Sequence, residues 1–526
     1  MDAIERIGIL CSEIENGLFL YGDYVSENMM TRMNELLWFV HTVPEVYRAA
    51  VEKQLLGLLP KSFRYSKVWL YSAIMRLTNN AKIFEQFQEY VLQERGFTAN
   101  VKFFLYYQFR REIFVQSDFG NNNMKYLQWK LLKQIVGMFR REMEDMFVPI
   151  SEKECDNNMV LVITEQILGN THGPTKIVLE RCKILLEIMH KKVLLINTAE
   201  VLTPVGSIPF CQASFGNYLK EYLEKEELEW GNVTIPFFQC ENNMPNVHTL
   251  RILIQTIRNM KPGLVIAFGG SSILINLVAT IFPVLNIGMS SDLEDTMATC
   301  QALSRPLNDM DRELLAKVGV HEEHVIQSMV TFKPLHQTSV LTRTELGLPE
   351  DKFILAIVGG RLDIEINEQF MDMLSCAIDD DIRIAIIGAF RTCDRYIEKF
   401  PKLRNKIYCL GYTDDFLAWI EVCDLFVNPC RKGGGTSGLE ALFKGVPVVT
   451  LPYGDVAVNV GKEFWTESYD TMSRLIRRYK NDTIYCNEMR KKARKRVNTL
   501  SNVAEDFQHT IHVFEQRIKS LRNVEK

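Results

Sequence analysis

The segment that most constrains the fold is residues 424–451, which read DLFVNPCRKGGGTSGLEALFKGVPVVTL. Short apolar runs at 425–427 and 446–450 predict two buried strands, and the apolar periodicity between them predicts a helix. We expect this helix to begin near Thr436 and Ser437, whose hydroxyls can cap it, and to end at the following glycine. A strand–loop–helix–strand unit of this kind is typical of an open α/β sheet.

Three consecutive glycines, Gly433, Gly434 and Gly435, make the loop of this unit a candidate anion site. Glycine allows close backbone approach, and the start of a helix offers unpaired N–H groups and a positive dipole end. That interaction contributes roughly 0.3–2 kcal/mol, enough to orient a diphosphate but not to bind it alone. Neither the P-loop pattern nor the dinucleotide pattern G-x-G-x-x-G is matched, and an ordinary flexible glycine loop is the alternative. Glu440 follows one helical turn after the loop, where its carboxylate could accept hydrogen bonds from ribose hydroxyls.

The run NPCRKGGGTSGLEALFKGVPVVTL, with its E-A-x-x-x-G-x-P-V-V spelling, resembles the nucleotide-sugar site of GT-B glycosyltransferases. It is closest to the large family 4-like group of retaining bacterial sugar transferases. It is also similar to the group containing O-GlcNAc transferase and the bacterial protein N-glucosyltransferases. The resemblance includes the lead-in LGLPED at 346–351, the turn VGGRL at 358–362 and the strand end Leu410, Gly411 and Tyr412, which in the family contacts the base.

The resemblance implies an α/β protein with two Rossmann-like domains, the GT-B fold, and an additional N-terminal α-helical domain. We expect a helical accessory domain at 1–150, an acceptor-side domain at 151–335 and a nucleotide-sugar domain at 336–526. The C-terminal helices would cross back to the first domain through Phe507, Ile511 and Phe514. Apolar runs predict buried strands at 159–164, 193–197, 263–268, 284–287, 353–358, 382–387 and 407–412.

The sequence departs from the family pattern at two charged positions. Family members carry a lysine about five residues after Arg361, but residues 363–367 read DIEIN. Lys432 stands eight residues before Glu440, where the family has a glutamate. We therefore hypothesise that the segment from Gly433 to Ser437 cradles a diphosphate that Arg361 and Lys432 neutralise. Replacing Lys432 with Ala should then sharply weaken nucleotide binding, and unchanged binding would refute the hypothesis.

A second loop, Gly169, Asn170, Thr171, His172 and Gly173, follows the first predicted strand. Ligands of open α/β sheets collect at the carboxyl ends of strands. The loop resembles the acceptor-side loop of GT-B enzymes, which implies that His172 is catalytic. It would be the general base of an inverting reaction or a donor to the sugar or phosphate. A histidine that only fixes the turn is the alternative.

Composition excludes several classes of protein. The chain has 526 residues with a net charge near −4 and mixed signs, so no nucleic-acid partner is indicated. Its twelve cysteines show no zinc spacing, which favours a reducing compartment. The start MDAIERIGIL lacks the basic region of a signal peptide, and we expect a cytoplasmic protein.

Three stretches resemble signals that we interpret otherwise. The uncharged stretch 262–291 is long enough to span a bilayer, but glycines, serines and Pro283 divide it into strand, helix and strand. The D-x-D spelling at 379–381 is interpreted as a solvated turn, so no metal is expected. The basic run 490–496, RKKARKR, is interpreted as a solvated helix face.

The sequence thus predicts a metal-independent hexosyltransferase that uses a nucleotide sugar, expected to be a UDP-sugar, and needs no other cofactor. The acceptor is a protein side chain or a glycan. Aromatic and basic residues are mixed at 101–111 and 125–133, which we interpret as helices of an accessory domain with solvated Lys and Arg. Contact of this domain with a partner protein or an acidic membrane surface is the alternative. The alternatives are a non-catalytic GT-B subunit, which binds an acceptor protein or stabilises a partner glycosyltransferase, and a sugar-nucleotide epimerase.

Overall fold

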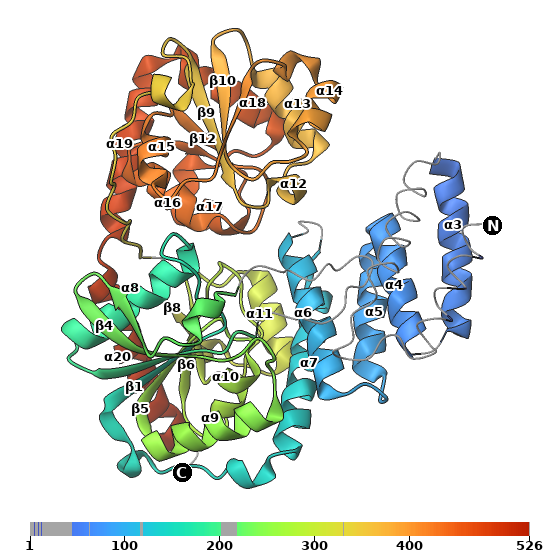
Figure 1. Cartoon of the computed structure of the whole chain (residues 1–526), viewed down its shortest axis with the longest axis vertical. Coiled ribbons are helices and arrows are strands. Elements are labelled where there is room, and N and C mark those ends of the chain that lie inside the picture. The colour runs from blue at the N-terminus through green and yellow to red at the C-terminus, as the bar shows by residue number, and fades with distance from the viewer. Residues whose placement is uncertain are drawn as a thin grey trace.

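The computed structural model describes residues 45–62, 64–115, 119–200, 218–329 and 331–524, together with the single residues 5, 9 and 12. Two parallel sheets, one above the other in Figure 1, form the frame of the molecule, and a row of helices stands beside the lower one. This confirms the predicted α/β fold with two Rossmann-like sheets and an N-terminal helical region.

The first sheet has eight strands in the order β3-β4-β2-β1-β5-β6-β7-β8. Its strands are β1 (Asp156–Thr164), β2 (Lys192–Asn197), β3 (Glu227–Trp230), β4 (Val233–Gln239), β5 (Pro262–Phe268), β6 (Val284–Ile287), β7 (Cys300–Leu303) and β8 (Val325–Gln327). All neighbouring strands are parallel except β3 and β4, which form an antiparallel hairpin at one edge. The predicted strands of this half are all present, whereas β3, β4, β7 and β8 were not predicted.

Among the described residues, four α-helices lie between β1 and β8 along the chain: α8 (Gly173–Glu187), α9 (Val247–Met260), α10 (Ile273–Val278) and α11 (Asp309–Val318). As predicted, Pro174 lies in the first turn of α8, where no backbone N–H is needed. The uncharged stretch 262–291 folds as β5, α10 and β6, as interpreted from its glycines and proline. In the described part of the chain, no helix is long and apolar enough to cross a membrane.

The second sheet has five parallel strands in the order β11-β10-β9-β12-β13. They are β9 (Phe353–Gly359), β10 (Ile382–Gly388), β11 (Ile407–Gly411), β12 (Leu425–Val427) and β13 (Val448–Val449). The helices of this half are α12 (Leu362–Glu365), α13 (Glu368–Ala377), α14 (Cys393–Lys399), α15 (Phe416–Glu421), α16 (Gly435–Phe443), α17 (Gly454–Val460), α18 (Tyr469–Asn481) and α19 (Thr483–Leu500).

The start of α16 differs from the prediction. The helix begins at Gly435, and Gly434 occupies the N-cap position with φ +90° and no side-chain cap. The hydroxyl of Ser437 donates instead to the carbonyl of Gly434 at 2.8 Å. Thr436 and Ser437 therefore lie inside the first turn, and the expected hydroxyl cap is wrong because the left-handed glycine already turns the chain into the helix.

The N-terminal helices are α3 (Glu45–Leu58), α4 (Arg64–Thr78), α5 (Ala81–Gln93), α6 (Ala99–Val115) and α7 (Asn122–Arg141). In Figure 1, α6 and α7 lie against the first half. Leu105 of α6 and Ile135 of α7 share one buried cluster with Leu161 of β1 and Leu274 of α10.

Most aromatic residues at 101–111 pack in the interior of the helical region, which leaves few of them for the partner or membrane contact given as the alternative. Phe103, Phe104 and Phe109 are all buried. The amine of Lys102 donates to the carbonyl of Val91 at 2.7 Å, so even its charged group is held inside the helical region.

The last helix, α20 (Val503–Val524), returns to the first half after α19 (Figure 1). Phe507, Ile511 and Phe514 are buried in the same cluster as Val160 of β1 and Cys182 of α8. The first sheet is thus covered on one face by α8 and α20, and on the other by α9, α10 and the N-terminal helices.

Candidate active site

A cleft of about 560 Å³ lies between the two halves. Its walls come from residues at or after the carboxyl ends of strands in both sheets, at 168–169, 171–173, 288–291, 358–361, 412–417, 431 and 433–435. In the second sheet, the strand order reverses between β9 and β12, and the glycine-rich loop and the turn after β9 meet there. This is the place where open α/β sheets bind their ligands.

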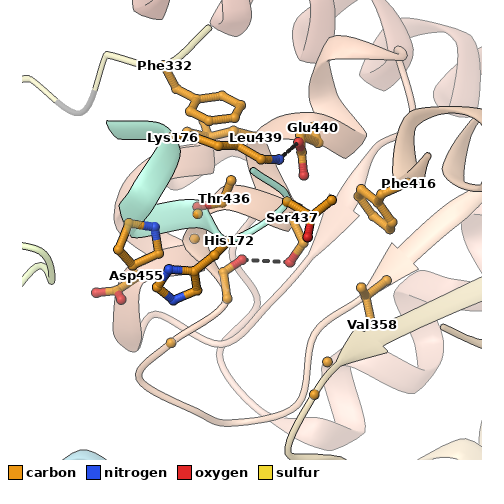
Figure 2. Close-up of a pocket in the computed structure, with 18 of the residues that line it drawn as sticks. His172, Lys176, Phe332, Val358, Phe416, Thr436, Ser437, Leu439, Glu440 and Asp455 are labelled. Atoms are coloured by element: carbon orange, nitrogen blue, oxygen red, sulfur yellow. Dashed lines mark hydrogen bonds and ion pairs between the residues drawn. The ribbon is translucent and has the colours of Figure 1, made fainter. Parts of the chain in front are cut away.

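The cleft brings together most of the predicted site residues. Those that line it are Gly169, Thr171, His172, Gly173, Arg361, Tyr412, Gly433, Gly434, Gly435, Thr436, Ser437 and Glu440. Asn170, Leu410, Gly411 and Lys432 are not among the lining residues. In Figure 2, His172 and Lys176 of the first half lie beside Thr436, Ser437 and Glu440 of the second half, and Lys176 points at Glu440.

Lys432 points toward Asp292 and not into the cleft, where the sequence had suggested a contact with the phosphates. Its Nζ lies 3.1 Å from Oδ2 of Asp292, and the Nζ of Lys125, on α7, lies 3.3 Å from the same oxygen. Although burial opposes ionisation, the two lysines lower the pKa of Asp292 to about 2. Lys432 thus neutralises a carboxylate where the helical region meets both halves, and this placement does not fit the role proposed for it at the phosphates.

Arg361 does line the cleft, and a glutamate links it to a second arginine. The Nε and Nη2 of Arg361 lie 3.1 and 2.9 Å from Oε1 of Glu365. Oε2 of the same carboxylate accepts from Nη1 of Arg431 at 2.7 Å. Burial raises the pKa of Glu365, but Arg431 and Arg361 outweigh it and hold this pKa below its usual value. Arg361 also lies over the ring of Phe114 from α6, 5.2 Å from its centroid.

Arg431 is a site residue that the sequence reasoning missed. It lines the cleft beside Gly434, whereas its neighbour Lys432 does not. The basic pair directly before the glycines was the available signal, but a sequence does not show which of two adjacent side chains faces the ligand.

His172 lies at the N-cap of α8, and its side chain makes no cap hydrogen bond. Its Nδ1 lies 3.0 Å from Oγ1 of Thr175, which also accepts from the N–H of Leu168 at 2.9 Å. The pKa of His172 is lowered to about 4, mainly by burial and then by the charges of Lys176 and Arg361. The imidazole is therefore neutral at pH 7, and with a proton on Nδ1 its Nε2 is a hydrogen-bond acceptor.

Glu440 forms an ion pair with a lysine of the other half of the molecule. Its Oε1 lies 2.8 Å from the Nζ of Lys176 on α8, and each side chain is only 7% exposed. Figure 2 shows this pair under the ring of Phe332. Burial raises the pKa of Glu440, while Lys176 opposes the rise. Glu440 thus joins the two halves, and only its Oε2 is left for the ribose contact expected from the sequence.

A second polar link joins the halves near the glycine loop. The N–H and the hydroxyl of Ser291 each donate to Oδ1 of Asp455 at 2.8 Å. Burial raises the pKa of Asp455 to about 6. Asp455 therefore loses its proton near pH 6, within the pH range of ordinary stability and activity measurements.

Residues of the two polar runs that could have indicated other sites form ion pairs. Asp379 and Asp381, from the D-x-D spelling, both pair with Lys480, at 2.8 and 3.1 Å. Arg490, from the basic run, pairs with Asp424 at 3.1 Å.

Comparison with known proteins agrees with this geometry. Residues 355–478, from β9 into α18, match the family described as Glycosyl transferases group 1. A mutant O-GlcNAc transferase from Thermobaculum terrenum superposes over 99% of this chain and 99% of its own, with 12% identity and a TM-score of 0.54. Sucrose-phosphate synthase from Thermosynechococcus elongatus covers 69% of this chain and 100% of its own, with 13% identity and a TM-score of 0.51. No curated protein sequence matches this one.

The chain has the GT-B fold, which it shares with these two structures. Its second half carries, in addition, the sequence pattern of the group 1 glycosyl transferases.

Proposed function

We propose that this protein is a glycosyltransferase that transfers a sugar from a nucleotide sugar, with a UDP-sugar as the expected donor, to an acceptor. One observation carries the proposal. The glycine-rich loop before α16 and Arg361 meet at the switch point of the second sheet, and the loop with His172 faces them across the same cleft. The match of the second half to glycosyl transferases supports the same reaction class.

The diphosphate would lie against the loop from Gly433 to Ser437. Backbone N–H groups at the start of α16 and the guanidinium of Arg361 favour negative charge at this position. In the reaction, the bond from the anomeric carbon to the phosphate oxygen breaks, and the electron pair stays on the leaving diphosphate. Fixed donors aimed at that growing charge stabilise the transition state, so we propose that the chemistry needs no metal.

The rest of the donor would be held by the second half. Tyr412, which is exposed at the cleft and follows β11, would contact the base, with the backbone of Leu410 and Gly411 behind it. Oε2 of Glu440 would accept from a ribose hydroxyl while Oε1 stays with Lys176.

His172 would act on the side of the acceptor. With Nδ1–H donating to Thr175, Nε2 can take the proton of an acceptor hydroxyl or amide as the acceptor atom bonds to the anomeric carbon. A positioned base contributes typically about 10²–10⁴-fold to a rate. In a retaining reaction the same nitrogen would instead hold the donor sugar. The acceptor, a protein side chain or a glycan, would enter between the loops at 168–173 and 288–291.

The purified chain tests the proposal with a panel of UDP-, ADP- and GDP-sugars. Melting temperature and nucleotide release are measured for each compound, because a ligand at about 100 times its Kd stabilises a native protein by roughly 2.7 kcal/mol. We expect one nucleotide class to raise the melting temperature and to be released from its sugar slowly.

A matched pair of variants makes the test specific. Arg361→Met should abolish the shift, whereas Arg343→Met should keep it, because Arg343 pairs with Asp424 away from the cleft, at 2.7 Å. If no compound stabilises or reacts, the enzymatic proposal is wrong and a companion subunit is the better account.

A further inference from the structure

Arg431 is the most deeply buried cation of the cleft. Its side chain is 3% exposed, and two of its three nitrogens have partners. Nε donates to Oδ1 of Asn428 at 2.9 Å, and Nη1 donates to Oε2 of Glu365 at 2.7 Å. Nη2 is buried and has no acceptor among the described residues. An unpaired guanidinium N–H in the interior is unfavourable and rare, so its presence here requires an explanation.

The guanidinium of Arg431 packs closely against two glycines. A Cβ on Gly359 would lie 2.5 Å from Nη1, and a Cβ on Gly434 would lie 2.6 Å from Nη2. Gly359 ends β9 and Gly434 belongs to the loop after β12, so the guanidinium lies between the two loops that meet at the switch point. A side chain at either position would have to displace the guanidinium, so the two glycines leave the space that it occupies.

The local charges leave this site positive. The carboxylate of Glu365 is shared by Arg361 and Arg431, which leaves one positive charge in excess. Arg361 is 45% exposed and can adjust its position, whereas Arg431 cannot. Residue 366, where a lysine would be expected from the family pattern, is the buried Ile366.

We infer that Arg431 is the fixed cation that receives the diphosphate of the donor, with Nη2 donating to a phosphate oxygen beside Gly434. This inference rests on the proposed function and names the residue that makes the cleft prefer a diphosphate over a monophosphate. Arginine suits the task because its planar, permanently charged donors match phosphate geometry.

Titration calorimetry of the full chain with UDP, UMP and inorganic pyrophosphate tests the inference. In Arg431→Lys, we expect the Kd for UDP to rise about 10–100-fold and pyrophosphate binding to be lost. The single ammonium group of a lysine cannot take the place of the Nη2 donor of Arg431. The Kd for UMP should change less than about threefold. The matched control is Arg343→Lys, because Arg343 forms an arginine–carboxylate pair with Asp424 at the other end of the sheet. It should leave the three Kd values unchanged.

A second variant keeps the test decisive if Arg431→Lys does not fold. Glu365→Gln removes the shared negative charge at constant size, so UDP should bind more tightly, with a smaller effect on UMP. The inference is wrong, and Arg431 is structural, if the wild-type chain binds UDP but the Arg431 and Glu365 variants change the Kd values for UDP and UMP equally or change neither. If the wild-type chain binds no nucleoside diphosphate, the proposed function fails with it.

Discussion

The ion pair between Lys176 and Glu440 gives the sharpest prediction about how the cleft is held together. The two residues come from different halves, lie 2.8 Å apart and are almost completely buried. At that distance and an effective dielectric constant of about 20, their attraction is roughly 6 kcal/mol. Much of this offsets the loss of hydration, but removal of one partner leaves the other charge buried and alone, which costs about 3–5 kcal/mol.

The perturbation is Lys176→Met, which keeps the length of the side chain and removes its charge. Burial already raises the pKa of Glu440, and without Lys176 this pKa must rise further. A carboxyl with a raised folded pKa favours the native state below its unfolded pKa, and this contribution is lost as the pH rises through the folded value. The variant should therefore be nearly as stable as the wild type at pH 4.5 and clearly less stable at pH 8.

Scanning calorimetry of the wild type, Lys176→Met, Glu440→Gln and the double variant at both pH values measures the effect. We expect Lys176→Met to melt several degrees lower at pH 8, and Glu440→Gln to restore most of the loss when the two are combined. A loss that is equal at the two pH values, or a double-variant coupling below about 0.5 kcal/mol, would refute the reasoning.

Three further predictions follow from the site. His172→Gln should lower kcat/KM by about 10²–10⁴-fold with little change in donor affinity, and the wild-type pH–rate profile should fall as the pH drops toward 4; a flat profile from pH 3 to 6 would exclude His172 as the base. Gly434→Ala, at φ +90° and against Arg431, should cost about 1–3 kcal/mol and abolish the nucleotide-induced thermal shift; an intact shift would contradict the proposed cradle. Asp455→Asn keeps an acceptor for Ser291 and removes a carboxyl whose pKa is raised to about 6, so its melting temperature should exceed that of the wild type at pH 8 but not at pH 4.5; a gain of the same size at both values would mean that charge is not the cause.

The buried parallel strands could be predicted because they consist of continuous apolar runs between turn signals. The hairpin β3–β4 was missed, although its signal was present. Buried and exposed residues alternate strictly along both strands, and Gly231 turns the chain with φ +64°. In β3, Glu227 and Glu229 face solvent and alternate with the buried Leu228 and Trp230, so no continuous apolar run marks the edge of the sheet.

The contacts of the charged residues could not be predicted in the same way. Lys176 and Glu440 are 264 positions apart, and no local pattern relates them. Lys432 fills the position of a family glutamate, which suggested a phosphate contact, but the chain directs it toward Asp292. The direction of a side chain in a loop depends on the elements that pack around it, and only the structure supplies them.

In the proposed function, the glycine-rich loop and the cations beside it hold the diphosphate of a nucleotide sugar. A crystal structure of the chain with a bound UDP-sugar, or with the nucleotide sugar selected by the panel, tests it most directly. We expect the two phosphates within hydrogen-bond distance of the backbone N–H groups of residues 433–437 and of Arg361, with the sugar toward His172. A nucleotide bound elsewhere, or a cleft that stays without one at saturating concentration, would contradict it.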